Sequence, residues 1–283
     1  MSRVKARWMV GVLVGAICAV CVACDDEEAQ APEAEKSVTS DDTSEAKQGE
    51  EAETPKEPSS GPAKLTIVHA GLGVDEVQLI LDGRLLPDTK PFGAFEGKPV
   101  YVEVPSGNHL LAVGQPSKKE GVIPPPLVTR SVELKAQASY TLLLAGVYGP
   151  RGKGEQALGL FVIPDAQGGE TAKGKAPLRA IHGVVNAPPV DVTSGRKGAK
   201  PALMLVNVGF GKASAFHSMM AGPDLLEFRS GLDSEAAPIY VSKRVVLAEG
   251  VYTTLLWLGK VGSTEHPPRL WALSADAAVA RAL

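Results

Sequence analysis

The sequence predicts an all-β protein, with two tandem antiparallel immunoglobulin-like β-sandwich domains after a signal peptide and a disordered acidic linker. Three observations lead to this fold class. From residue 63 onward, short apolar runs alternate with turn residues. The second half of this region repeats the first half. Residues before 63 have a different composition, which cannot form an apolar core.

The first segment is typical of a cleavable signal peptide. Arg3, Lys5 and Arg7 precede an uninterrupted run over positions 8–23 that contains no charged side chain. A helix that spans a membrane needs about 20 apolar residues, so this run is short for a permanent anchor. Export of a cleaved chain is therefore favoured over an uncleaved anchor.

The end of this segment points to lipid attachment. Cys21-Val22-Ala23-Cys24 places a small residue directly before a cysteine, and it resembles the cleavage site of bacterial lipoproteins. The resemblance implies that Cys24 becomes the acylated N-terminus, with fatty acids such as palmitate holding it to a membrane. Two or more chains give stable anchoring. We expect a bacterial cell-envelope location on the periplasmic or surface side, with simple secretion as the alternative.

The stretch after Cys24 is acidic. Residues 25–62 hold 13 acidic and 3 basic residues, a net charge of −10, and few large apolar side chains. Such a segment cannot offset its chain entropy by burial, so we expect a disordered tether. The predicted organisation is a signal peptide at 1–23, lipidated Cys and tether at 24–62, first sandwich at 63–167, linker at 168–176 and second sandwich at 177–283.

The strands of the first repeat follow from apolar runs between turn signals. In chain order they are 65–69, 77–81, 100–104, 109–113, 128–134, 140–145 and 158–163. Turns between them are marked by Asp82-Gly83, Ser106-Gly107 and Gly149-Pro150. Helical periodicity is absent until the alanine-rich end, where residues 273–283 predict a short terminal helix.

The repeat keeps a nearly constant displacement. Residues 65–70 match 178–183 and residues 141–146 match 254–259, both at 113 positions. The remaining matches pair 107–111 with 222–226 at 115 positions and 162–165 with 273–276 at 111 positions. Matches in the same order at such similar spacing predict two domains of one kind.

These residues resemble a known family, domain of unknown function 4397, which occurs in bacterial envelope proteins and often in tandem on lipoproteins. The first repeat carries His69, Phe92-Gly93, Tyr101, Pro105, Gly107, Tyr140-Thr141 and Gly146. The second carries His182, Pro188-Pro189-Val190-Asp191-Val192, Gly222, Tyr252-Thr253 and Gly259. The resemblance implies a fold but no established activity. Gln78 stands where the family's aspartate falls, so an aspartate site is not shared by both repeats.

The candidate ligands are His69, His182 and Asp191. Two histidines at equivalent positions, with an aspartate nearby, could bind a metal ion or perform acid–base chemistry. Strand alternation favours another role, because it turns His182 inward, where its ring would hydrogen-bond the backbone of the next loop. We therefore predict no catalytic residue, no metal and no cofactor.

The composition restricts the function further. All three cysteines lie in the leader, so the mature body has no disulfide and no thiol nucleophile. The HExxH and GxSxG hydrolase motifs are absent from the sequence. Residues 63–283 carry a net charge of +4 without a basic run interleaved with aromatics, so we expect no nucleic-acid partner.

These observations favour a non-catalytic, lipid-anchored envelope protein with a structural, adhesive or ligand-binding role. Its partners would be membrane lipid, through Cys24, and an envelope protein or glycan. The alternatives are a hydrolase with a His/Asp site in the second repeat, or a metal carrier.

Overall fold

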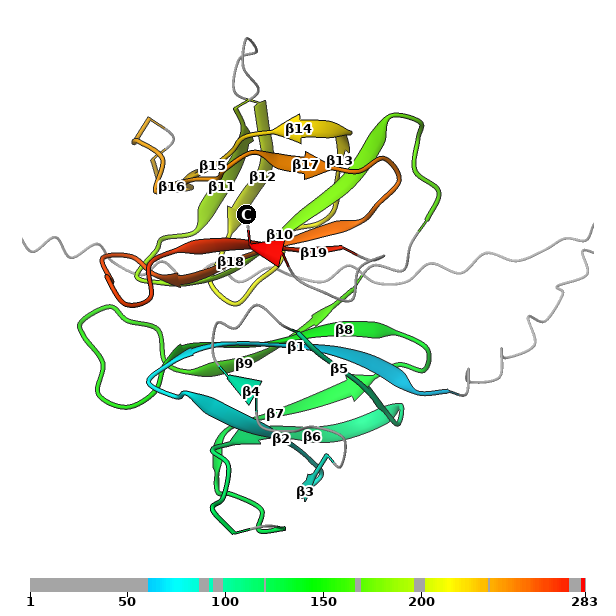
Figure 1. Ribbon diagram of the computed structural model, residues 1–283, viewed down its shortest axis with the longest axis vertical. Coiled ribbons are helices and arrows are strands. Elements are labelled where there is room, and N and C mark those ends of the chain that lie inside the picture. The colour runs from blue at the N-terminus through cyan, green and yellow to red at the C-terminus, as the bar shows by residue number, and fades with distance from the viewer. Residues whose placement is uncertain are drawn as a thin grey trace, which may run out of the picture. The chain divides into compact units, whose positions relative to one another are not determined.

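The computed structural model describes residues 61–86, 92–93, 99–119, 121–165, 169–195, 202–233, 235–274 and 281–282. The predicted signal peptide, Cys24 and residues 25–60 of the tether lie outside the described residues. All regular secondary structure in the described part is β, as the sequence predicts (Figure 1). No helix in these ranges is long and apolar enough to cross a membrane.

The first sandwich is made of two sheets. One has the strand order β5-β1-β8-β9, and the other has the order β3-β2-β6-β7 with β4 paired to β2. Their bounds are β1 Ala63–Leu72, β2 Glu76–Leu81, β3 Arg84–Leu85, β4 Phe92–Gly93, β5 Val100–Val104, β6 Gly107–Gly114, β7 Pro126–Leu134, β8 Ser139–Val147 and β9 Gly159–Pro164.

The second sandwich repeats this plan, with β20 added at the edge of one sheet and a further two-stranded sheet. Its sheets have the orders β13-β10-β18-β19-β20 and β12-β11-β15-β16, and the pair β14-β17 is separate. The bounds are β10 Lys175–Val185, β11 Val190–Ser194, β12 Ala202–Val208, β13 His217–Met220, β14 Gly222–Asp224, β15 Leu226–Ser230, β16 Tyr240–Val241, β17 Val245–Leu247, β18 Thr253–Lys260, β19 Arg269–Ser274 and β20 Arg281–Ala282. Strand β10 begins inside the predicted linker 168–176.

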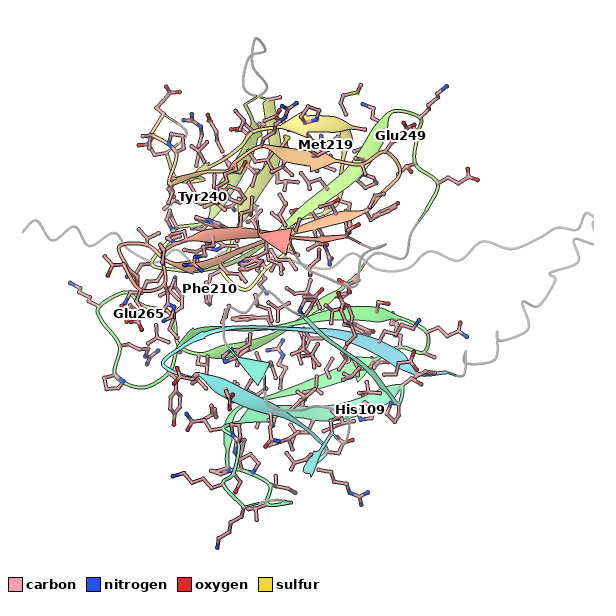
Figure 2. All side chains as sticks on the ribbon, in the orientation of Figure 1. His109, Phe210, Met219, Tyr240, Glu249 and Glu265 are labelled. Carbon is pink, nitrogen blue, oxygen red and sulfur yellow. The ribbon has the colours of Figure 1, made fainter. Side chains whose placement is uncertain are left out.

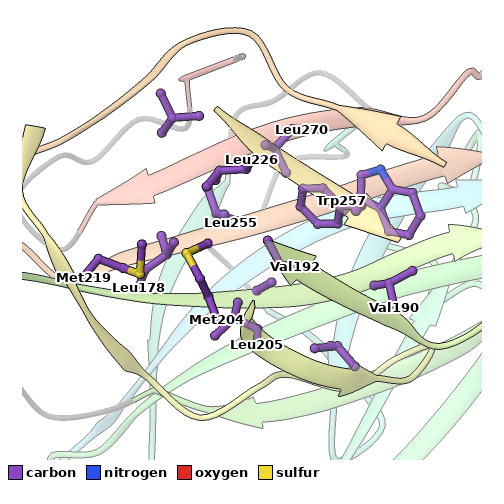
Figure 3. Packing of buried hydrophobic residues seen from close by; sticks show 14 of the residues in the cluster. Leu178, Val190, Val192, Met204, Leu205, Met219, Leu226, Leu255, Trp257 and Leu270 are labelled. Carbon is purple, nitrogen blue, oxygen red and sulfur yellow. The ribbon is translucent and has the colours of Figure 1, made fainter. Parts of the chain in front are cut away.

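Each sandwich has its own apolar core, built by strand alternation. In the second, Val190 and Val192 of β11 pack in the same cluster as Leu255 and Trp257 of β18 (Figure 3). The first core holds the corresponding Val77 and Leu79 of β2, both fully buried, with Leu65, Leu111 and Leu142. Burial of these side chains is the main favourable term in the stability of each sandwich.

One strand pair in each sandwich departs from the antiparallel arrangement that the sequence predicts. Strand β1 runs parallel to β8, and β10 runs parallel to β18. Leu65 pairs with Tyr140 and Leu178 pairs with Thr253, so both members of the pair shift by the displacement found in the sequence. The sequence repeat therefore corresponds to an identical register in three dimensions.

The end of the second repeat differs from the prediction. Tyr140 pairs with Pro164 and Thr253 pairs with Ser274, which gives a displacement of 110 for the last strand instead of 111. A shift by one residue exchanges the two faces of a strand, and at 110 the buried Ile163 corresponds to the buried Leu273. Residues 273–274 belong to β19 and residues 281–282 to β20, so the predicted terminal helix is wrong there.

A third apolar cluster joins the two sandwiches. It contains Val68 and Leu143 of the first sandwich with Ile181 and Leu256 of the second, all facing away from their own cores. Polar contacts flank it, including an ion pair between Lys260 Nζ and Glu155 Oε1 at 2.5 Å. Both faces of sheet β5-β1-β8-β9 and of sheet β13-β10-β18-β19-β20 are thus used in packing, which explains their long apolar runs.

Candidate functional site

His69 lies inside the first sandwich near the end of β1. Its side chain is buried, and its Nδ1 atom accepts a hydrogen bond from the backbone N–H of Gly71 at 3.1 Å. Burial lowers the pKa of His69 to about 4, although a hydrogen bond with the backbone of Val74 and the charge of Asp75 oppose this shift. The ring is therefore neutral at pH 7.

His182 has the same arrangement in the second sandwich. Its Nδ1 accepts from the backbone N–H of Val184 at 3.1 Å, and its Nε2 donates to the carbonyl of Pro188 at 3.1 Å. The ring lies 4.9 Å from the Trp257 ring and 6.0 Å from the Phe210 ring, between centroids. Burial lowers the pKa of His182 to about 4. This inward direction and backbone bonding agree with the sequence prediction.

Asp191 is not brought into contact with this ring. Val190 and Val192 on either side of it face the core, so Asp191 faces the opposite side of β11. Its Oδ1 accepts a hydrogen bond from the backbone N–H of Asn207 at 2.7 Å, where the β11–β12 register shifts. The carboxylate thus supports a β-bulge. In the described ranges, no group of three or more potential metal ligands occurs.

Sequence reasoning missed a histidine–aspartate contact in the first sandwich. Figure 2 labels His109 in the first sandwich. Its Nδ1 lies 2.7 Å from Asp82 Oδ2, and its Nε2 lies 2.9 Å from the carbonyl oxygen of Pro105. Asp82 Oδ1 also accepts from the N–H of Leu110 at 2.8 Å. The hydrogen bond from His109 holds the pKa of Asp82 below its usual value. The pairing of β2 with β6 brings Asp82 beside His109, and no local sequence pattern indicates this pairing.

Beside this contact is a cleft of about 700 Å³, which Asp82, Arg84 and Glu103 line together with apolar residues. Both nitrogens of His109 are engaged by Asp82 and Pro105. This arrangement holds the turn that follows β2 against strand β6. It lacks the hydrogen bond between a nucleophile and a base that covalent catalysis requires.

A second cleft, of about 390 Å³, lies where the two sandwiches meet. Arg179 of β10 contributes to its wall, and each of its three guanidinium nitrogens donates a hydrogen bond. It donates to Thr254 Oγ1 at 2.9 Å, to the carbonyl of Pro164 at 2.8 Å and to Asp165 Oδ1. Thr141 Oγ1 donates to the same Asp165 oxygen at 2.8 Å. This partly buried network joins the two sandwiches.

Comparisons with known proteins give one family match. Residues 63–193 match Domain of unknown function (DUF4397). This match supports one copy of the domain, and it runs from β1 through β11, beyond the first sandwich. No curated protein matches the chain. A solved structure, "The Bacillus anthracis TIE protein", is similar at 11% identity and a TM-score of 0.24, covering 71% of this chain and 34% of its own. The chain thus spans about a third of that protein.

Proposed function

We propose that the protein is a lipid-anchored, non-catalytic component of the bacterial cell envelope. In this proposal Cys24 carries the lipid, residues 25–62 form a tether, and the two sandwiches form a body that binds an envelope protein, a glycan or a small ligand. The supporting features are the leader sequence that ends at Cys24 and a body without cysteine. The match to DUF4397 is compatible with this function but assigns none.

We also propose that the second sandwich is a second copy of the same domain. The parallel pairs β1–β8 and β10–β18 have the same register once the constant displacement between the repeats is applied. His69 and His182 accept a backbone hydrogen bond from the residue two positions later, in both cases at 3.1 Å. Shared strand order can arise independently, whereas a shared buried ring with the same backbone bond supports a common origin.

The main support for the non-catalytic proposal is the hydrogen bonding of the His182 ring. Its two ring nitrogens bond to the main chain, so neither has a free lone pair for a metal ion or a substrate proton. Asp191 bonds to a backbone N–H elsewhere. These contacts favour a structural role for both residues over the hydrolase and the metal-carrier alternatives.

Cys24→Ala is expected to abolish incorporation of fatty acid into the protein and to release it from membranes. The reason is that the thiol of Cys24 is the attachment atom in the proposed anchor. The measurement is labelling with radioactive palmitate in a bacterial host, followed by membrane fractionation. Cys18→Ala is the matched control, because it removes another leader cysteine and should keep the label. Retention of lipid by the Cys24→Ala protein would contradict the anchor.

A further inference from the structure

The cleft between the sandwiches has a size and lining suited to a small ligand. Its walls come from β7, β9, β10 and the segment 211–214, which follows β12. Its volume of about 390 Å³ falls within the usual range for ligand pockets, roughly 300–1,000 Å³. Neither the buried histidines nor the Asp82–His109 contact belongs to this lining.

The charge of the cleft is positive. Arg130 and Lys212 line it, both are exposed, and neither forms an ion pair with any residue that the structure describes. The third cation, Arg179, is neutralised by Asp165. Two unpaired cations therefore remain around one concave space, a pattern suited to binding an anion. The guanidinium of Arg130 can hold a phosphate or carboxylate through two parallel hydrogen bonds.

Part of the lining of the cleft is apolar. Phe161 and Val162 of β9 and Ala213 after β12 are half-buried and line it. Phe161 packs edge-on against Phe210, with ring centroids 5.5 Å apart. A Cβ atom at Gly211, where φ is +70°, would lie 2.2 Å from the Phe161 ring, so glycine is required for this close approach. The wall is thus held in place by tight packing.

We propose that this cleft binds an organic anion in which a phosphate or carboxylate group carries a short apolar chain. Arg130 and Lys212 hold the charged group, and the chain lies against Phe161, Val162 and Ala213. The neutral Arg179–Asp165 pair forms the polar side of the site and adds no net charge. This inference specifies the binding role of the function proposed above. Acyl labelling tests only the anchor, so the two can fail separately.

The test is calorimetric titration of the purified full-length protein with hexyl phosphate. We expect binding, with weaker binding of inorganic phosphate, which lacks the chain, and of hexanol, which lacks the charge. The double variant Arg130→Gln/Lys212→Gln should weaken hexyl phosphate binding by about tenfold or more, because two charge-assisted contacts are lost. Both side chains are exposed, so folding is preserved, and an unchanged melting temperature verifies this.

The matched control is Lys243→Gln/Arg244→Gln, which removes the same charge from exposed positions that do not line the cleft. It should leave hexyl phosphate binding unchanged. Equal weakening in both double variants would overturn the site, since it would reflect net charge alone, and absence of binding to the parent would also overturn it. Flotation with phosphatidylglycerol vesicles identifies the source of the anion. Flotation of the parent that is lost in the Arg130→Gln/Lys212→Gln variant indicates that the anion is a lipid headgroup. Binding of hexyl phosphate without flotation of the protein indicates a free small molecule.

Discussion

As the pH falls from 7 to 4, the free energy of unfolding should decrease by about 3 kcal/mol for each of His69 and His182. Both rings are buried, and both have a pKa lowered from 6.5 to about 4 in the folded protein. In the unfolded chain each ring takes up its proton near pH 6.5. Protonation therefore favours the unfolded state throughout this interval.

The sign follows from the lowered pKa of the folded state. Above pH 6.5 the rings are neutral in both states, so their full contribution to stability is present there. Between pH 6.5 and about 4 only the unfolded chain binds the protons, and stability falls with each unit of pH. Below about pH 4 the folded rings also titrate, and the loss from this pair levels off.

Urea unfolding at several pH values, followed by tryptophan fluorescence, measures this slope. His69→Asn and His182→Asn should each remove about one proton from the uptake on unfolding, because an asparagine does not titrate but keeps an acceptor near the Nδ1 position. His217, exposed on β13, is the matched control for loss of one imidazole. A slope that is the same in the parent and in His182→Asn would show that the buried ring does not govern acid stability.

Gly146→Ala and Gly259→Ala should each destabilise the protein by about 3 kcal/mol or more. The two glycines are equivalent in the repeat and have φ angles of +109° and +122°. A Cβ at Gly146 would lie 2.1 Å from the carbonyl oxygen of Ala157, and one at Gly259 would lie 2.6 Å from that of Pro267. Backbone hydrogen bonds hold both loops, because Val147 N–H donates to Gln156 and Lys260 N–H donates to His266. The loops therefore cannot retreat without losing these bonds.

Gly149→Ala and Gly262→Ala provide the controls for this second prediction. They are also equivalent in the repeat, with φ angles of +89° and +79°, and a Cβ at either would meet open space. Only backbone strain of about 1 kcal/mol is then expected. Chemical denaturation of the four variants measures their free energies of unfolding, and the comparison separates backbone strain from the steric clash of the added Cβ atom. Similar losses in all four would mean that the close approach to the neighbouring carbonyl is not limiting.

Most of the fold prediction depended on the sequence repeat, which indicated two domains of one kind. Its displacement of 113 relates the β1–β8 pair to the β10–β18 pair residue by residue, because these apolar runs face packed surfaces on both sides and tolerate no slip. The parallel direction of both pairs was not predicted. The last strand was placed one position out, since Val162 and Ile163 are both apolar and composition does not distinguish their faces. The alanine-rich end suggested a helix, but Leu273 packs into the cluster between the sandwiches, and tertiary burial overrides propensity there.

The candidate site was predicted less completely. Alternation showed that His182 points inward, and the structure supplies its partners, Val184 and Pro188. The contact between His109 and Asp82 was missed because the residues are 27 positions apart and are joined only by the β2–β6 register. The cleft with Arg130 and Lys212 combines residues from both sandwiches. No local pattern in the sequence reveals such a site.

The parallel pairing of β1 with β8 also affects how the chain is made. Leu65 pairs with Tyr140, and Leu178 with Thr253, so the parallel neighbour of each opening strand comes near the end of the same sandwich. A chain that crosses a membrane from its N-terminus would expose the apolar β1 until most of the sandwich had emerged. Such high contact order slows folding and prolongs the time during which unpaired edges can associate. In the export route proposed above, folding of this protein should therefore depend on factors that hold the unfolded chain at the exit side of the membrane.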